Sequence, residues 1–149
     1  MITKILFKIV FPALLLAPTL AEAGTIPAGT TLTVRTQETI RSVDAPGTRF
    51  SAQLVNNITV KGKTMLRAGT EVSGKVVTSR RLYGSSQRLT VDIIEITVSG
   101  RKLPIKTTGA VQLDNTNFKT KNDRYVSRGG YAVGAGRVIQ FQLAQPLNF

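Results

Sequence analysis

The sequence contains no cysteine and no histidine among its 149 residues. Without cysteine, neither a disulfide bond nor a thiolate metal site can form. Without histidine, Ser-His-Asp and Cys-His catalysis are excluded, together with metal sites that need imidazole ligands. The folded state must therefore be stabilised by side-chain packing and backbone pairing.

Acidic residues are few: the chain has 8 Asp and Glu against 20 Lys and Arg, a formal net charge of +12. This charge favours anionic partners such as lipopolysaccharide, acidic glycans, nucleic acid or acidic proteins. The basic residues are mostly spread along the chain, so a surface that is merely soluble and basic explains the composition equally well.

The first 23 residues have the layout of a secretory signal peptide. Lys4 and Lys8 form a basic start, Ile9 to Leu20 is mostly apolar, and Ala21-Glu22-Ala23 is a small-residue cleavage signal. The apolar run is short for a membrane helix, which needs about 20 residues; an uncleaved N-terminal anchor is the alternative. Cleavage would leave residues 24–149 as a single domain with 18 basic and 7 acidic residues, hence a net charge of +11.

The remainder of the chain shows alternating apolar and polar residues rich in Thr, Val and Ile, which is typical of β-strands. The predicted strands are Thr31–Ile40, Arg49–Asn56 with Ile58 and Val60 extending it, Thr64–Ser79 with a break at Ala68-Gly69, Arg88–Val98, Lys102–Thr107 and Arg137–Phe149. A hairpin turn is expected at Lys61-Gly62-Lys63. We predict an all-β domain, a small closed or partly open antiparallel barrel of about six strands; a two-sheet β-sandwich is the alternative.

An Ala-Gly pair precedes an alternating strand three times, at Gly29, Gly69 and Gly136. Each pair marks a place where the backbone must bend or adopt a positive φ, which glycine does readily. Such corners let a sheet turn and close. Gly74 is a fourth structural glycine, expected to face inward within its strand.

Two adjacent isoleucines, Ile93 and Ile94, change the phase of alternation in the strand that contains them, which predicts a β-bulge. The bulge would place Asp92 and Glu95 both outward, where they are the nearest approach to a catalytic carboxylate pair. A carboxylate-dependent glycan hydrolase needs two such groups across a cleft. A solvated strand face beside Arg or Lys is the simpler interpretation, and we expect no enzymatic activity.

Basic and aromatic residues gather in two predicted loops, the second within a long flexible, glycine-containing loop at about 114–136. Arg and Tyr together can hold phosphates and stack on sugars or bases, although charges can also simply keep a loop soluble. The candidate binding residues are Arg80, Arg81, Tyr83 and Arg88 in the first loop, and Lys119, Lys121, Arg124, Tyr125 and Arg128 in the second.

Four stretches resemble a known family when taken in order: IPAGT, SVDAPGTRFSAQLVNNI, LRAGTEVSGKV and YGSSQRLTVDIIEITVSGRKLPI. They are similar to the β-barrel domain of TrbI-type conjugation scaffolds, which belong to the outer-membrane complexes of type IV secretion systems. The resemblance covers most of residues 26–105. The chain is also similar to small exported proteins of unknown function that consist of this barrel alone. Because the sequence starts with a predicted signal peptide, we expect no counterpart in this chain of the cytoplasmic segment, membrane helix and proline-rich stalk of the scaffolds.

The resemblance implies a non-enzymatic binding or assembly module of the cell envelope, periplasmic or associated with the outer membrane, or secreted. Its expected partner is an envelope protein or an anionic envelope component, and homo-oligomerisation is an option. A monomeric basic module that binds an anionic polymer is the alternative. Nucleic acid is not the expected partner, and the mature chain should not span a membrane. No cofactor is expected, because the run GGYAVGAG lacks the Lys-Ser/Thr ending and the helix of a phosphate loop.

Overall fold

The structure, a computed structural model, describes residues 24–79, 88–113 and 131–149. These residues contain strands, turns and bends but no helix, so the predicted all-β class is confirmed. The predicted signal peptide lies outside the described residues. Thirteen strands are found in the described part of the chain: β1 (Thr25–Ile26), β2 (Thr31–Thr36), β3 (Ile40–Arg41), β4 (Arg49–Leu54), β5 (Ile58–Val60), β6 (Lys63–Leu66), β7 (Glu71–Thr78), β8 (Thr90–Val98), β9 (Arg101–Pro104), β10 (Val111–Gln112), β11 (Ala132–Val133), β12 (Val138–Gln142) and β13 (Leu147–Asn148).

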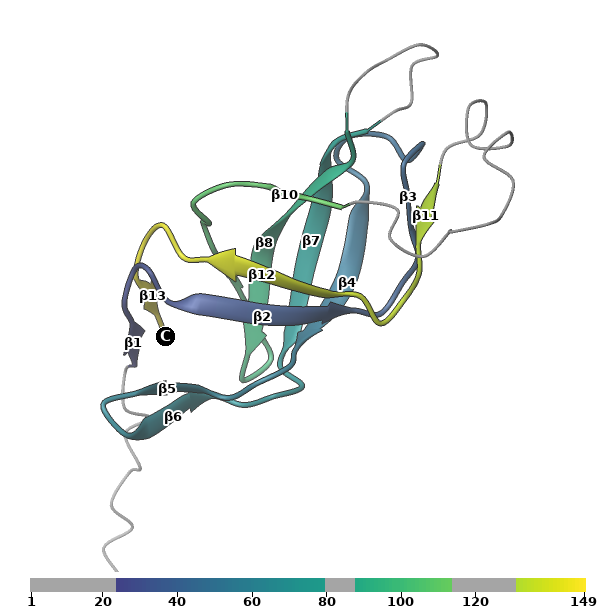
Figure 1. Ribbon diagram of the computed structural model, residues 1–149. Helices are drawn as coiled ribbons and strands as arrows, with labels where there is room; N and C mark the ends of the chain where they lie inside the picture. Colours follow the sequence, from purple (N-terminus) through teal and green to yellow (C-terminus); the bar gives the residue numbers. More distant parts are fainter. Residues whose placement is uncertain (1–23, 80–87, 114–130) are drawn as a thin grey trace, which may run out of the picture.

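The main sheet is antiparallel and follows the order β10-β8-β7-β4-β2-β12, with β9 also paired to β8. It coils strongly, so that β2 and β12 run at a steep angle to β4, β7 and β8 (Figure 1). The segment after β9 ties the two sides together: Thr107 bridges Leu143, and Thr108 N donates to Gln142 O at 2.9 Å. The result is the predicted partly open barrel rather than a two-sheet sandwich.

The core fills the inside of this curl because apolar side chains alternate along each long strand. In β2 the buried positions are Leu32, Val34 and Thr36, and in β4 they are Phe50, Ala52 and Leu54. Ile139, Phe141 and Leu143, which alternate with polar residues in and just after β12, are also buried. Burial of this apolar surface is the main force that holds the barrel together.

The glycine corners are confirmed. Gly29, Gly69 and Gly136 have φ values of 85°, 88° and 90°, and Gly47 adds a fourth corner with φ 91°. These corners lead into β2, β7, β12 and β4, the four consecutive strands in the middle and at one side of the sheet.

Each corner glycine also donates its N–H to the end of the strand beside it. Gly29 N bonds to Leu143 O at 2.7 Å and Gly136 N to Thr36 O at 2.7 Å, so β2 and β12 are tied at both ends. Gly69 N and Gly47 N do the same for β4 and β7, bonding to Leu54 O at 2.8 Å and to Val76 O at 2.7 Å. The same glycine N–H hydrogen bond occurs four times and marks the ends of two antiparallel strand pairs, β2–β12 and β4–β7.

The predicted bulge is present in β8. Ser73 of β7 pairs with Glu95 but the next residue, Gly74, pairs with Ile93, so Ile94 is the extra residue. A second irregularity leaves Val77 of β7 unmatched. The bulge explains why Ile93 and Ile96 are both fully buried although they are three residues apart.

Several strand boundaries differ from the prediction. The last predicted strand, Arg137–Phe149, is divided into β12 and β13. Ile58 and Val60 do not extend β4; they belong to β5, which forms a separate hairpin with β6 below the barrel in Figure 1. The chain leaves the sheet at Asn57, whose side-chain Oδ1 accepts a hydrogen bond from Ala68 N at 2.8 Å. The hairpin turn itself is as predicted, with φ values of 51° at Lys61 and 79° at Gly62.

The first predicted strand, Thr31–Ile40, is divided into β2 and β3. The predicted loop at about 114–136 contains a short strand, β11, near its C-terminal end. Ile40–Arg41 form β3 apart from β2, and β3 pairs with β11, Ala132–Val133, which was expected to be loop. Residues 114–130 of that loop lie outside the described residues. Two short strands, β1 and β13, pair the start and the end of the described chain, with Gly24 N donating to Phe149 O at 2.6 Å.

Candidate functional site

The candidate site is built around the ends of the two basic segments. Of the nine candidate binding residues, Arg88 is described, and its side chain is exposed. Its partners from the first segment lie in 80–87, and those of the second lie in 114–130, both outside the described residues: Arg80, Arg81, Tyr83, Lys119, Lys121, Arg124, Tyr125 and Arg128. The structure does show where each segment leaves the barrel and where it returns.

The residues that directly follow the first segment are hydrogen-bonded to the residues that directly precede the second segment. Leu113 N donates to Leu89 O at 2.9 Å, and the guanidinium of Arg88 donates from Nη1 to Gln112 Oε1 at 3.1 Å. Gln112 lies directly opposite Thr90 in the β10–β8 pair. The points at which the two predicted segments join the barrel therefore lie on adjacent strands, which their separation in the sequence does not reveal.

Tyr131 holds the two ends of the second segment together. Its hydroxyl donates to Leu113 O at 2.6 Å, which joins the residue after position 130 to the residue before position 114. Ser42, which is fully buried, accepts from Tyr131 N at 2.7 Å and donates its own N–H to Tyr131 O at 2.8 Å. No local pattern in the sequence indicates this arrangement, because it joins residues 89 positions apart.

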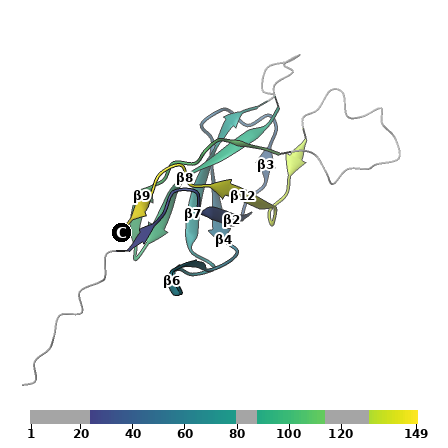
Figure 2. The same cartoon turned by 60° about the vertical axis from the view of Figure 1, so that its left-hand side comes forward.

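The two ends of the first segment are joined by Thr78. Its hydroxyl lies 2.6 Å from Arg88 O and 2.7 Å from the hydroxyl of Thr90. Ser79, the last described residue before the segment, is 4% exposed and its Oγ has no hydrogen-bond partner among the described residues. We use the name loop rim for Thr78, Arg88, Gln112, Leu113 and Tyr131, which border residues 80–87 and 114–130. The ends of β7 and β8 and the strand β11, which adjoin these ranges, lie in the upper part of the barrel in Figures 1 and 2.

The carboxylates on β8 are engaged in contacts of the fold. Asp92 Oδ1 accepts a hydrogen bond from the Thr107 hydroxyl at 2.6 Å, and Glu95 Oε1 lies 3.7 Å from Lys102 Nζ. Asp92 and Glu95 both lie on the outer side of the sheet, as the predicted bulge requires. Val91, which precedes Asp92, and Ile93, which follows it, are buried on the inner side. No group of three or more Asp and Glu that could hold a metal ion is found in the residues described.

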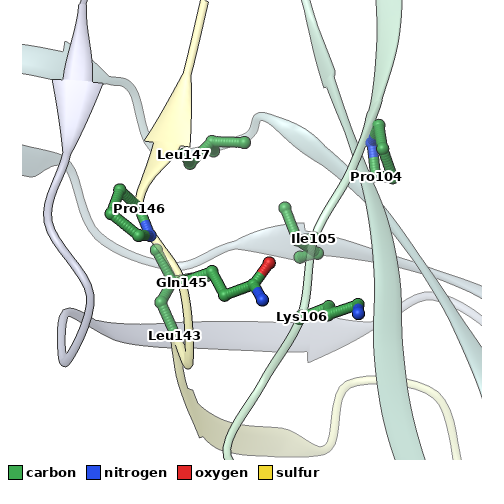
Figure 3. A pocket seen from close by; sticks show the side chains of 7 residues that line it. All are labelled: Pro104, Ile105, Lys106, Leu143, Gln145, Pro146 and Leu147. Carbon is green, nitrogen blue, oxygen red and sulfur yellow. The ribbon is translucent and has the colours of Figure 1, made fainter.

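A small depression lies away from the rim, where the segment after β9 and the segment before β13 separate. Figure 3 shows Pro104, Ile105 and Lys106 on one side of it and Pro146 and Leu147 on the other. Leu143 and Gln145 complete its lining. The depression is mainly apolar and contains neither carboxylate of β8, so it does not supply the cleft that a glycan hydrolase would need.

Comparison with known proteins adds no family to this description. No protein-family model matches the chain, and no curated protein matches it significantly in sequence. Within the ranges that the structure describes, no helix is long and apolar enough to cross a membrane.

Proposed function

We propose that the protein is a non-enzymatic, exported binding or assembly module of the cell envelope, and that the loop rim is the base of its binding surface. The observation that carries the proposal is the pair of bonds from Arg88 to Gln112 and from Tyr131 to Leu113, which hold together the described residues that flank both basic segments. A rigid support that presents several cations together favours an anionic partner, since each charge strengthens the field at the others.

The resemblance to the barrel of TrbI-type scaffolds supports the envelope location, as does the predicted signal peptide. In this proposal the partner is an anionic component of the outer membrane or an acidic surface of an envelope protein. The barrel serves as a scaffold and performs no chemistry, which agrees with the complete absence of histidine and cysteine.

The test is retention of the purified protein on vesicles of outer membrane. Charge reversal of the five arginines at positions 80, 81, 88, 124 and 128, combined with replacement of Tyr83 and Tyr125 by Ala, should abolish most of the retention. The matched control reverses five exposed cations outside the rim and the two segments: Arg35, Lys61, Arg67, Arg101 and Lys106. Equal loss in both variants would show that only net charge matters, and unchanged retention in the rim variant, with folding intact, would refute the proposal.

The assembly part of the proposal is tested separately by sedimentation of the purified protein over a wide range of concentration. A ring-forming subunit should show concentration-dependent association. A monomer at every concentration, still retained on vesicles, would leave the binding function and remove the assembly function.

A further inference from the structure

The outer face of β4 and β7 places two cations directly opposite each other. Arg49 of β4 is the register partner of Lys75 of β7, and both side chains are exposed. Register partners in an antiparallel pair point to the same side of the sheet, with Cβ atoms about 4.5–5.5 Å apart. The residues next to them, Phe50 and Gly74, are also partners and face the core, so Arg49 and Lys75 face away from it.

Like charges in this position destabilise a strand pair unless an anion lies between them. Within the described part of the chain, the side chains of Arg49 and Lys75 make no hydrogen bond or ion pair. Asp92 is the register partner of Lys75 on its other side, but one of its oxygens accepts the hydroxyl proton of Thr107. Arg49 is separated from Asp92 by the whole width of β7.

The neighbouring position along the same face carries two hydroxyl groups. Ser51 of β4 is the partner of Ser73 of β7, and both are partly exposed. The two pairs are about 7 Å apart along the strands, since each residue advances the chain by about 3.3 Å. One patch on the sheet thus carries a guanidinium, an ammonium and two hydroxyls. Within the described residues, these groups make no side-chain hydrogen bond or ion pair.

We propose that this patch, the cationic face formed by Arg49, Ser51, Ser73 and Lys75, binds a phosphoryl group. Arginine can hold a phosphate with two parallel hydrogen bonds, lysine adds a point charge, and hydroxyls donate to the remaining oxygens. The bound anion would also remove the repulsion between Arg49 and Lys75. Asp92 and Glu95 lie beside the patch on β8, opposite Lys75 and Ser73. Asp92 Oδ1 already accepts from Thr107 and Glu95 Oε1 is buried, so the second oxygen of each carboxylate is the one that would accept a hydrogen bond from a sugar hydroxyl.

This inference goes beyond the proposed function, because it concerns a strand face and not the loop rim. It needs only residues that the structure describes. Binding at the cationic face can therefore be present or absent whatever the outcome of the vesicle experiment.

The experiment measures thermal unfolding of the purified protein, residues 24–149, in sodium phosphate and in sodium chloride of the same ionic strength. Phosphate should raise Tm in a saturable way beyond the effect of chloride, because a ligand that binds only the folded state stabilises it. In R49Q/K75Q the apparent affinity for phosphate should fall at least tenfold. The control R67Q/R101Q removes the same charge from exposed positions elsewhere and should keep the affinity within about twofold.

A second arm replaces inorganic phosphate by glucose 1-phosphate. Tighter binding of the sugar phosphate, lost in D92N/E95Q, would identify a phosphorylated sugar as the source, and equal binding would identify the phosphoryl group alone. Amide chemical shifts of the unsubstituted protein provide a test that needs no variant, since those of Ser51 and Ser73 should move with added phosphate. The absence of a phosphate-specific effect, or the same loss in R67Q/R101Q, would overturn the proposal.

Discussion

The ring of Phe50 occupies the space that a side chain at Gly74 would need. These two residues are register partners on β4 and β7, and a Cβ placed on Gly74 would lie 2.6 Å from Cε1 of the ring. Such a separation is far below van der Waals contact, so the two positions are coupled. Gly74 is required for close packing here and not for an unusual φ.

Replacing Gly74 by Ala should destabilise the protein, because the added methyl group displaces the buried ring of Phe50. Overpacking of this kind costs about 1–3 kcal/mol. Gly109→Ala is the matched control, since nothing lies within 4 Å of the added Cβ there. Urea denaturation measures both variants. If G74A were as stable as G109A, the ring would not be held against β7 as described.

The coupling can be tested in the same system with the double variant F50L/G74A. A smaller side chain at position 50 gives room to the new methyl group, so G74A should cost less in the F50L background than alone. Contacting residues commonly show such interaction energies of about 0.5–3 kcal/mol. Strictly additive losses would indicate that the two residues do not touch.

The corner at Gly69 provides a further prediction. Its φ of 88° is one that side chains rarely adopt, although nothing lies within 4 Å of an added Cβ. Gly69→Ala should therefore cost about 1–2 kcal/mol through backbone strain alone. Gly134→Ala has the same open surroundings without the positive φ and should cost less. Comparable losses in the two variants would contradict the role given to the corner.

Tyr131 provides another prediction, which concerns the loop rim. Tyr131→Phe removes the hydroxyl that donates to Leu113 O and should cost about 1 kcal/mol, the usual net value of such a bond. Amide hydrogen exchange should then increase at Leu113 and Tyr131 but not in β4. Unchanged exchange at both residues would show that the hydroxyl does not hold the two ends together.

The faces of the strands could be read from the sequence, because alternation reports burial directly. Phe50, Ala52 and Leu54 alternate along the predicted strand Arg49–Asn56 and are buried, and the adjacent pair Ile93 and Ile94 marks a bulge. The glycine corners could also be read, since a positive φ selects for glycine whatever the rest of the fold.

What the sequence did not provide was the pairing of distant segments. The contact between β3 and β11 and the bond from Tyr131 to Ser42 join residues about ninety positions apart, and no local pattern encodes such a partner. The same reason applies to the candidate site. The residue types of the two basic clusters were visible in the sequence, whereas the bond from Arg88 to Gln112 that brings their attachment points together was not.

The central claim is that the two basic segments act as one binding surface because they share the loop rim. It is tested most directly by a double-mutant cycle of vesicle retention, with R80E/R81E in one segment, R124E/R128E in the other, and all four together. Residues that serve one ligand together are coupled, so each pair of reversals alone should remove most of the retention and the combination should add little. Independent losses that sum in the fourfold variant, with all proteins equally folded, would contradict the claim.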